Sequence, residues 1–199
     1  MRRIVVNNSV TLDGVMQAPG RPDEDRRGGF EHGGWAAPYF DSVMAEAAGE
    51  GMANATALLF GRRTYEDFAS VWPTMPEDNP FTTVINESQK LVASRTLKAP
   101  LSWKNSTLLE GDAAEAIARL RQEAGPDLVI LGSGELIQSL MLHDLINEFR
   151  LLIHPLVLGS GRRLFVDGGA LARFRLMDTK TSTTGVVIAT YRPAEQVTA

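Results

Sequence analysis

The sequence predicts a single α/β domain over residues 1–199, with a mostly parallel central sheet and a C-terminal antiparallel hairpin. Two observations carry this prediction. Short apolar runs alternate with segments of helical periodicity, which is the order expected for parallel strands joined by crossover helices. Near the C-terminus, strand-like segments at 174–181 and 186–191 are separated only by residues 182–185, which is typical of a hairpin.

The first half of the chain contains five predicted strands or helices and one long loop. Ile4-Val5-Val6 is β-branched and predicts a buried strand within 3–10. Residues 19–35 are rich in glycine and charge, so we expect a binding loop or lid, with a structureless insertion as the alternative. An apolar stripe at three- and four-residue spacing predicts a helix over 38–52. The segments that follow are a strand at 55–60, a helix at 64–71 and a strand at 90–93.

The second half continues the alternation of helix and strand. Asp112, with Glu115 three residues later, predicts a capped helix that ends before Gly125-Pro126. The nearly all-apolar run 127–131 is expected for a strand covered on both faces. The remaining predicted elements are a strand at 107–109, a helix at 135–142 and a strand at 149–154.

The composition excludes several classes of function. The chain is 44% hydrophobic and 22% charged, as in a globular protein, and its net charge of −4 argues against a nucleic-acid partner. There is no cysteine, which removes disulfides and cysteine-ligated zinc. The histidines have no carboxylate at metal-ligand spacing, so we expect no metal site and treat them as ordinary surface or core residues. They are His32, His143 and His154.

No apolar run approaches the roughly 18 residues that a membrane helix needs. The apolar segment after Arg2-Arg3 ends at Asn7, which is too early for a secretory leader. We therefore expect no membrane partner and a cytoplasmic location.

The most informative stretch is Gly61-Arg62-Arg63-Thr64, which follows an apolar run and precedes a predicted helix. Unpaired N–H groups and the positive end of the dipole make a helix N-terminus a site for anions. Arginine adds bidentate, charge-assisted hydrogen bonds to phosphate oxygens. The pattern therefore predicts a phosphate-binding turn, against the alternative of a solvated arginine pair.

Two further strand ends carry similar chemistry. Gly132-Ser133-Gly134-Glu135 resembles a second phosphate cradle with bare backbone N–H groups, and Ser94-Arg95 follows the strand at 90–93. If the strands are parallel, all three clusters lie at one edge of the sheet. Together they indicate a ligand with a diphosphate and a further phosphate, as in NADPH. Neither a Rossmann glycine fingerprint nor a Walker lysine is present.

At this level of detail the chain resembles the dihydrofolate reductase fold family. More closely, it is similar to the reductase domain of the bifunctional riboflavin-biosynthesis deaminase-reductase and its stand-alone bacterial relatives. Four motifs in order, spread over nearly the whole chain, carry the resemblance. They are residues 9–14 (SVTLDG), 61–66 (GRRTYE), 129–134 (VILGSG) and 154–165, which begins His-Pro and contains GSGRRLF.

The resemblance implies a dihydrofolate reductase-like three-layer fold and NADPH as the cofactor. Arg62 and Ser94, with Arg95, would hold the 2′-phosphate, and the main chain near Ser9 would face the nicotinamide amide. The loop 12–35 would close over the hydride-transfer site. The pyrophosphate would lie between two groups of residues, Arg63 and Thr64 after Gly61 on one side, and Gly132, Ser133, Gly134 and Glu135 on the other.

The family places a carboxylate on its first helix, and Asp41 is the nearest match, with Glu46 one turn further on. Asp41 is therefore the predicted catalytic acid, against the alternative that it only stabilises the helix start. Asp13 is a second candidate, although an Asp-Gly pair is more often a turn. Trp35 and Tyr39 either line a flat substrate pocket or pack in the interior.

Residues 159–163 (GSGRR) could form another anion loop, but we favour a glycine-rich turn between strands. The function expected from these features is an NADPH-dependent reductase that transfers hydride to a small pyrimidine- or pterin-like heterocycle, including a ribosylaminopyrimidine of riboflavin synthesis. The resemblance also implies a homodimer. The alternatives are a catalytically silent nucleotide-binding sensor or scaffold, and a phosphosugar-binding module that takes no dinucleotide.

Overall fold

The computed structural model describes residues 1–52, 57–79 and 81–194. They form one eight-stranded sheet with the strand order β4-β3-β2-β5-β1-β6-β8-β7. The six strands from β4 to β6 are parallel, and β8 and β7 add an antiparallel hairpin at one edge. The predicted fold class is thus confirmed. The strands are β1 (Ile4–Thr11), β2 (Ala57–Gly61), β3 (Lys90–Ala93), β4 (Ser106–Leu109), β5 (Leu128–Leu131), β6 (Glu148–His154), β7 (Phe174–Thr181) and β8 (Val187–Pro193).

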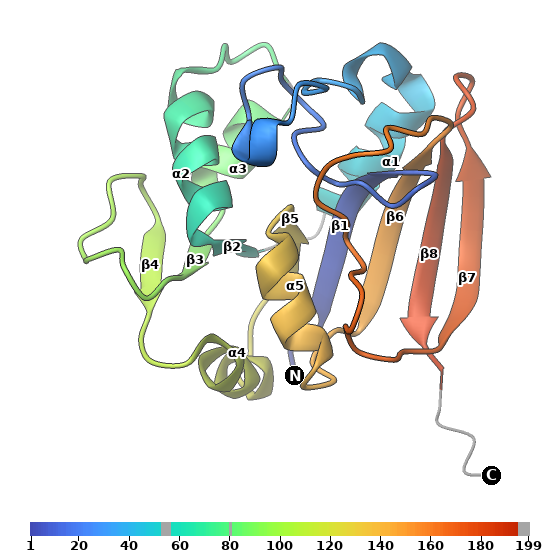
Figure 1. The fold of residues 1–199 in the computed structure, drawn as a ribbon. Coiled ribbons are helices and arrows are strands. Elements are labelled where there is room, and N and C mark those ends of the chain that lie inside the picture. Colours follow the sequence, from blue (N-terminus) through green and yellow to red (C-terminus); the bar gives the residue numbers. More distant parts are fainter. Residues whose placement is uncertain (53–56, 80, 195–199) are drawn as a thin grey trace, which may run out of the picture.

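Helices cover both faces of the sheet, which makes three layers (Figure 1). In Figure 1, α5 lies in front of the sheet beside α4, and α1 lies behind β6. The α-helices are α1 (Ser42–Met52), α2 (Arg62–Val71), α3 (Thr82–Glu87), α4 (Ala113–Gln122) and α5 (Gly134–Met141). Short 3₁₀ turns are at Arg27–Gly29, Ala37–Tyr39 and Trp72–Thr74. None of these described helices combines the length and apolar character needed to cross a membrane.

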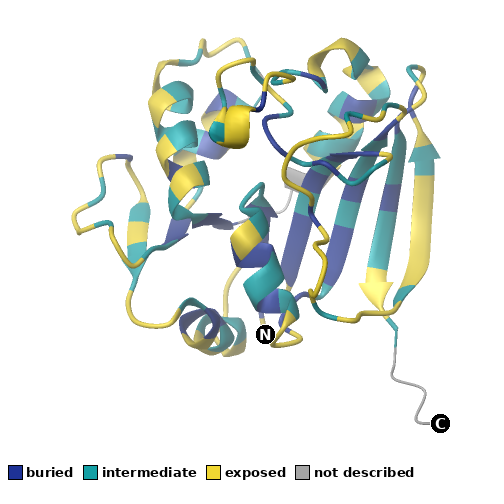
Figure 2. Ribbon diagram, viewed as in Figure 1, coloured by how far each residue is buried: buried dark blue, intermediate teal, exposed yellow. Residues whose placement is uncertain are grey.

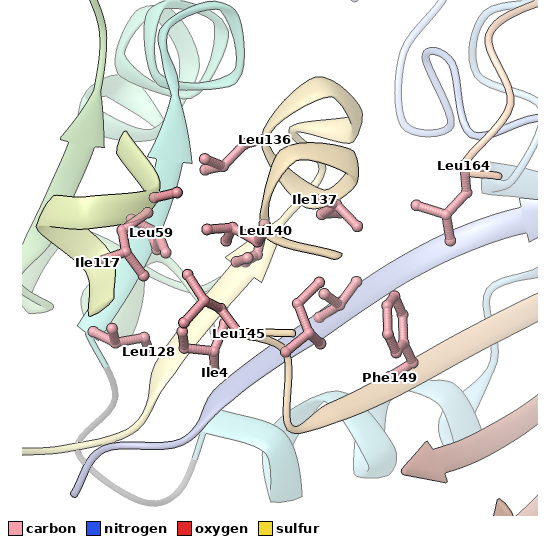
Figure 3. Packing of buried hydrophobic residues seen from close by; sticks show 14 of the residues in the cluster. Ile4, Leu59, Ile117, Leu128, Leu136, Ile137, Leu140, Leu145, Phe149 and Leu164 are labelled. Atoms are coloured by element: carbon pink, nitrogen blue, oxygen red, sulfur yellow. The ribbon is translucent and has the colours of Figure 1, made fainter. Parts of the chain in front are cut away.

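Successive side chains of a strand point to opposite faces of the sheet, so there is one hydrophobic core on each face. Ile4 and Val6 of β1 pack with α4 and α5, whereas Val5 packs with α2 and α3. Figure 2 shows the buried residues concentrated in the central strands, and Figure 3 shows the first core at close range, with Ile117 and Leu140 directed at the sheet.

Local sequence signals locate most elements to within a few residues. The Asp112 side chain accepts hydrogen bonds from the amides of Ala114 and Glu115, as the predicted cap requires. Two predictions differ from the structure. The helix α1 begins at Ser42, four residues after the predicted start, and α3 was not predicted. Residues 55 and 56 of the strand predicted at 55–60 lie outside the described residues.

We expect Leu140→Ala to lower the free energy of unfolding by about 2–5 kcal/mol, since the side chain is fully buried in the first core and its loss leaves a cavity. Leu142→Ala is the matched control, because Leu142 is 66% exposed and its loss should change stability by less than about 0.5 kcal/mol. Urea unfolding of both variants measures the difference. Equal effects would contradict the assigned packing of α5.

Candidate active site

A cavity of about 750 Å³ opens at the carboxyl ends of the parallel strands. Its walls come from the end of β1, the turns after β2 and β5, the starts of α2 and α5, and the loop between β1 and α1. The segment after β6 closes one side, and it runs in front of β1 beside α5 (Figure 1). The cavity thus lies where open parallel sheets generally bind ligands.

The two glycine turns predicted as phosphate sites meet in this cavity and are joined by hydrogen bonds. The Ser133 hydroxyl accepts from the Gly61 amide at 2.9 Å, and the Ser133 amide donates to the Thr64 hydroxyl at 3.1 Å. Gly132 has a φ of +69°, and a Cβ there would lie 3.2 Å from the Thr64 methyl carbon, so glycine suits this position. The predicted convergence of the two turns is therefore present.

One part of the prediction needs correction, because the second turn is not bare. The Gly132 amide donates to the Asn8 side-chain oxygen at 2.7 Å, and the Ser133 amide is held by Thr64. These two groups build the turn and are not free for an anion. Among the described residues, five amides at the starts of α2 and α5 have no hydrogen-bond partner. They belong to Arg63, Thr64, Gly134, Glu135 and Leu136.

Arginines outnumber carboxylates in the cavity wall, although the whole chain is acidic. Arg62 forms an ion pair with Glu66 at 3.1 Å on the half-exposed face of α2. Because such surface ion pairs are weak, a ligand can displace this one. The lining arginines are Arg26, Arg27, Arg62, Arg63, Arg162 and Arg163.

Arg162 and Arg163 are lining residues that sequence reasoning set aside as part of a plain turn. The backbone of this turn pairs with the loop after β1, since the Met16 amide donates to the Arg162 carbonyl at 2.9 Å. Arg163 donates to the Asp13 carbonyl at 2.8 Å. The adjacent arginines in a glycine-rich turn were the available signal, but only the pairing of two distant loops brings them to the cavity.

Ser94 and Arg95 follow β3 at the same edge of the sheet, since Ala93 pairs with Gly61. They do not belong to the cavity wall. The Ser94 hydroxyl accepts from the amides of Thr96 and Leu97 and thus forms a local turn. The structure brings Arg62 to the cavity without them.

Ser9 lies in the cavity wall, as expected for a residue near the reacting part of a ligand. β5 ends at Leu131 opposite Asn7, so β1 extends beyond it and its edge at Asn8 and Ser9 has no strand neighbour on that side. This divergence of two parallel strands opens the floor of the cavity. Asn8, which sequence reasoning missed, links that floor to the Gly132 turn.

The loop 12–35 is folded over the cavity, and the alternative of a structureless insertion is wrong. Val15, Ala18, Phe30 and Trp35 form a small core of their own. The Gln17 side chain connects three segments, because its nitrogen donates to the carbonyls of residues 25 and 27 while its oxygen accepts from the Arg162 amide at 2.9 Å.

The structure does not bring Asp41 to the cavity wall. One of its oxygens accepts from the Met44 amide at 2.9 Å, which caps α1, and the other accepts from the Thr183 amide and hydroxyl at 2.6 and 2.7 Å. The Thr183 hydroxyl and the Met44 amide lower the pKa of Asp41. The geometry favours the alternative, in which Asp41 stabilises the start of the helix and ties it to the hairpin.

The second candidate acids also lie outside the cavity wall. Asp13 accepts hydrogen bonds from the Thr11 hydroxyl and from the amides of Leu158 and Gly159, and the Thr11 contact lowers its pKa. It therefore fixes the segment after β6. Glu46 is exposed on α1.

Aromatic walls come from a region that the sequence did not single out. Phe68, Trp72 and Phe81 line the cavity together with Ile85. The residues that we expected either to line a pocket or to pack are packed instead. Trp35 is buried and donates to the Gln17 carbonyl, and Tyr39 stacks edge-on against His154 at 5.5 Å.

His154 is fully buried, and burial lowers its pKa. Nδ1 lies 3.0 Å from the Leu152 carbonyl, which assigns the proton of the neutral ring to Nδ1, while Nε2 has no partner among the described residues. His32 and His143 are exposed. Among the residues that the structure describes, no three histidine or carboxylate side chains are grouped as metal ligands.

The fold and the cavity thus define an α/β domain with a ligand-type cavity at the carboxyl edge of its sheet. A family model, the RibD C-terminal domain, matches residues 2–188, and the chain belongs to that family. It is 25% identical over 193 residues to the uncharacterized protein YyaP of Bacillus subtilis (strain 168), covering 96% of this chain and 94% of the relative.

Solved structures share the fold. A putative riboflavin biosynthesis protein from Shewanella sp. PV-4 superposes with a TM-score of 0.65 at 20% identity, over 97% of this chain and 99% of that one. Dihydrofolate reductase from Enterococcus faecalis, complexed with NADP(H), gives a TM-score of 0.59 at 12% identity, with 97% of each chain covered.

We expect Asp41→Ala to lower the thermal unfolding midpoint, since the Met44 amide and the Thr183 groups lose their acceptor. Thr183→Ala removes one end of the same tie, so the double variant should fall short of the sum of the two single effects. Calorimetry of the four proteins measures this coupling. Strictly additive shifts would contradict the tie between α1 and the hairpin.

The contribution of His154 to stability should fall as the pH decreases from 7 to 5, because the unfolded chain takes up a proton at His154 near pH 6.5 more readily than the folded protein, whose His154 pKa is lowered. Above that range both states are neutral and the penalty vanishes. His154→Phe should flatten this slope in urea unfolding series, with His143→Gln as the exposed control. A slope unchanged in His154→Phe would contradict the assignment.

Proposed function

We propose that this protein is an NADPH-dependent reductase that transfers hydride to a small pyrimidine- or pterin-like substrate. The observation that carries the proposal is the convergence of the Arg62 and Ser133 turns on one cavity at the carboxyl edge of the sheet. Family membership and a reductase-like fold support it.

The residues in the cavity fit a dinucleotide phosphate. Two helix N-termini contribute amides without hydrogen-bond partners among the described residues, and arginines line both sides of the cavity. Arg62 would hold the 2′-phosphate, while the amides of Arg63 and Thr64 and those of Gly134 and Glu135 would hold the diphosphate. When bound, NADPH supplies the hydride.

The protein's own residues would divide the cavity into two parts. The glycine turns and the arginines form a polar part that suits phosphates. Phe68, Trp72, Phe81 and Ile85 of α2, α3 and their connection form an apolar, aromatic part that suits a flat heterocycle. The folded loop 12–35 contributes to the cavity wall and would exclude water.

A catalytically silent nucleotide-binding protein is the second candidate, favoured by the position of Asp41 outside the cavity. NADPH oxidation with dihydrofolate or a phosphoribosylaminopyrimidine would exclude it, whereas NADPH binding without turnover across such a panel would contradict the reductase. Stronger binding of ribose phosphate than of NADPH would favour a phosphosugar module.

As part of this proposal, the protein is a cytoplasmic homodimer, as the resemblance implies. Light scattering tests the dimer.

We expect Arg62→Ala to weaken NADPH binding by about 1.5–3 kcal/mol, since a charge-assisted contact to phosphate is lost. NADH, which lacks the 2′-phosphate, should bind both proteins with similar affinity. Fluorescence titration measures these dissociation constants. Arg119→Ala, on the exposed side of α4, is the control, and equal NADPH affinity in Arg62→Ala and the wild type would contradict the 2′-phosphate assignment.

A further inference from the structure

Four carboxyl side chains lie in the wall of the cavity, and three of them are next to an arginine. Asp25 pairs with Arg27 and Asp67 with Arg21, each at 2.5 Å. Glu135 is 3.4 Å from Arg162. Glu24 is the fourth, and among the described residues it forms no ion pair.

Glu24 is held by the backbone instead. Its Oε2 atom accepts from the Gly20 amide at 2.7 Å and from the Arg21 amide at 3.1 Å. Within the described part of the chain, no hydrogen bond involves Oε1. Because two N–H groups already donate to Oε2, the proton of the neutral acid has its place on Oε1.

The turn that presents Glu24 is specified locally by glycine. A Cβ at Gly33 would lie 2.7 Å from the carbonyl oxygens of Arg21 and Pro22, so only a glycine allows this close packing of the loop on itself. Arg21 then ties the turn to α2 through Asp67, which precedes the aromatic Phe68 in the cavity wall. The turn that carries Glu24 is thereby tied to the helix that contributes Phe68 to the cavity wall.

The surroundings of Glu24 favour its protonated form. Burial raises its pKa and the Asp67 carboxylate adds to this, while the two amides and the Arg21 guanidinium oppose it. Arg21 is itself shared with Asp67 and with Asp23 at 3.5 Å, which weakens its effect on Glu24.

We propose that Glu24 is the catalytic acid that protonates the substrate, an inference that rests on the reductase function proposed above. Three observations carry it. Glu24 lies in the cavity wall, and within the described ranges it lacks the arginine that pairs with each of the other lining carboxylates and receives no hydrogen bond at Oε1.

Reduction of a C=N or C=O group adds a hydride to the carbon and a proton to the nitrogen or oxygen. In this assignment Oε1 of Glu24 gives up the proton, and its O–H bond breaks as the new N–H or O–H bond forms. The resulting carboxylate keeps the two amide hydrogen bonds at Oε2, which stabilise the negative charge until solvent returns a proton.

The first test needs no substrate. With glutamate labelled at the side-chain carboxyl carbon, an NMR titration from pH 3 to 9 follows each carboxyl group, and the signal missing in Glu24→Gln identifies Glu24. We expect it to titrate clearly above the ordinary value of about 4.3. Titration at or below that value overturns the inference.

The second test compares turnover in Glu24→Gln and in the matched control Glu31→Gln, which carries the same change at an exposed position of the same loop outside the cavity wall. Glutamine keeps an oxygen for the two amides but cannot release a proton. With dihydrofolate and a phosphoribosylaminopyrimidine as the panel, kcat of Glu24→Gln should fall about 10²–10⁴-fold with the NADPH dissociation constant unchanged. Glu24→Asp, which retains an ionisable carboxyl, should recover part of the rate.

The pH profile separates a chemical role from a structural one. The kcat of the wild type should decline as the pH rises through the Glu24 pKa. The kcat of Glu24→Gln should not show this decline. If Glu24→Gln keeps the kcat of the wild type and the same decline at high pH, the inference is overturned and the proposed function stands. A wild-type protein that neither binds NADPH nor oxidises it with the panel overturns the proposed function first, and this inference with it.

Discussion

The hydrogen bonds around Ser133 determine the shape of the cavity. This residue has a φ of +62°, a left-handed conformation that costs a non-glycine residue of order 1–3 kcal/mol. Its hydroxyl and its amide each make a hydrogen bond to the turn after β2, and these bonds offset that strain. Because β2 and β5 are parallel neighbours, the same bonds fix two helix N-termini side by side. The strand order brings the two turns together, and these bonds hold the arginines and the free amides in one binding surface.

The charge distribution follows from the same geometry. The chain has a net charge of −4, but its arginines are concentrated where two positive helix ends already meet. Such a cavity attracts anions locally while the rest of the surface repels them, which favours small anionic ligands over polyanions. The four lining carboxylates moderate this field, and three of them form ion pairs with arginine. Glu24, the fourth lining carboxyl group, therefore differs from these three in the charges around it as well as in its position.

The fold was largely predictable because its signals are local. Apolar runs identified the strands, and the Asp112 cap identified α4. The helix α3 escaped prediction because its six residues carry no helical stripe, and it is held by tertiary contacts such as that of the Thr82 hydroxyl with the Pro76 carbonyl at 2.8 Å. Asp41 carried a clear helix-start signal, and it was the family pattern that suggested an acid at this place. The hairpin contact with Thr183 accounts for the same carboxylate in a structural role.

The sequence by itself determined the fold class, the alternation of elements and the two phosphate-type turns, since glycine conformation, helix starts and apolar periodicity are properties of neighbouring residues. Only the tertiary structure decided which turns share a cavity, which amides are already used, and which acid faces the cavity. Arg162 reaches it through pairing with a loop about 145 residues away in the chain. Such long-range contacts depend on strand order and loop packing, and no local pattern encodes them.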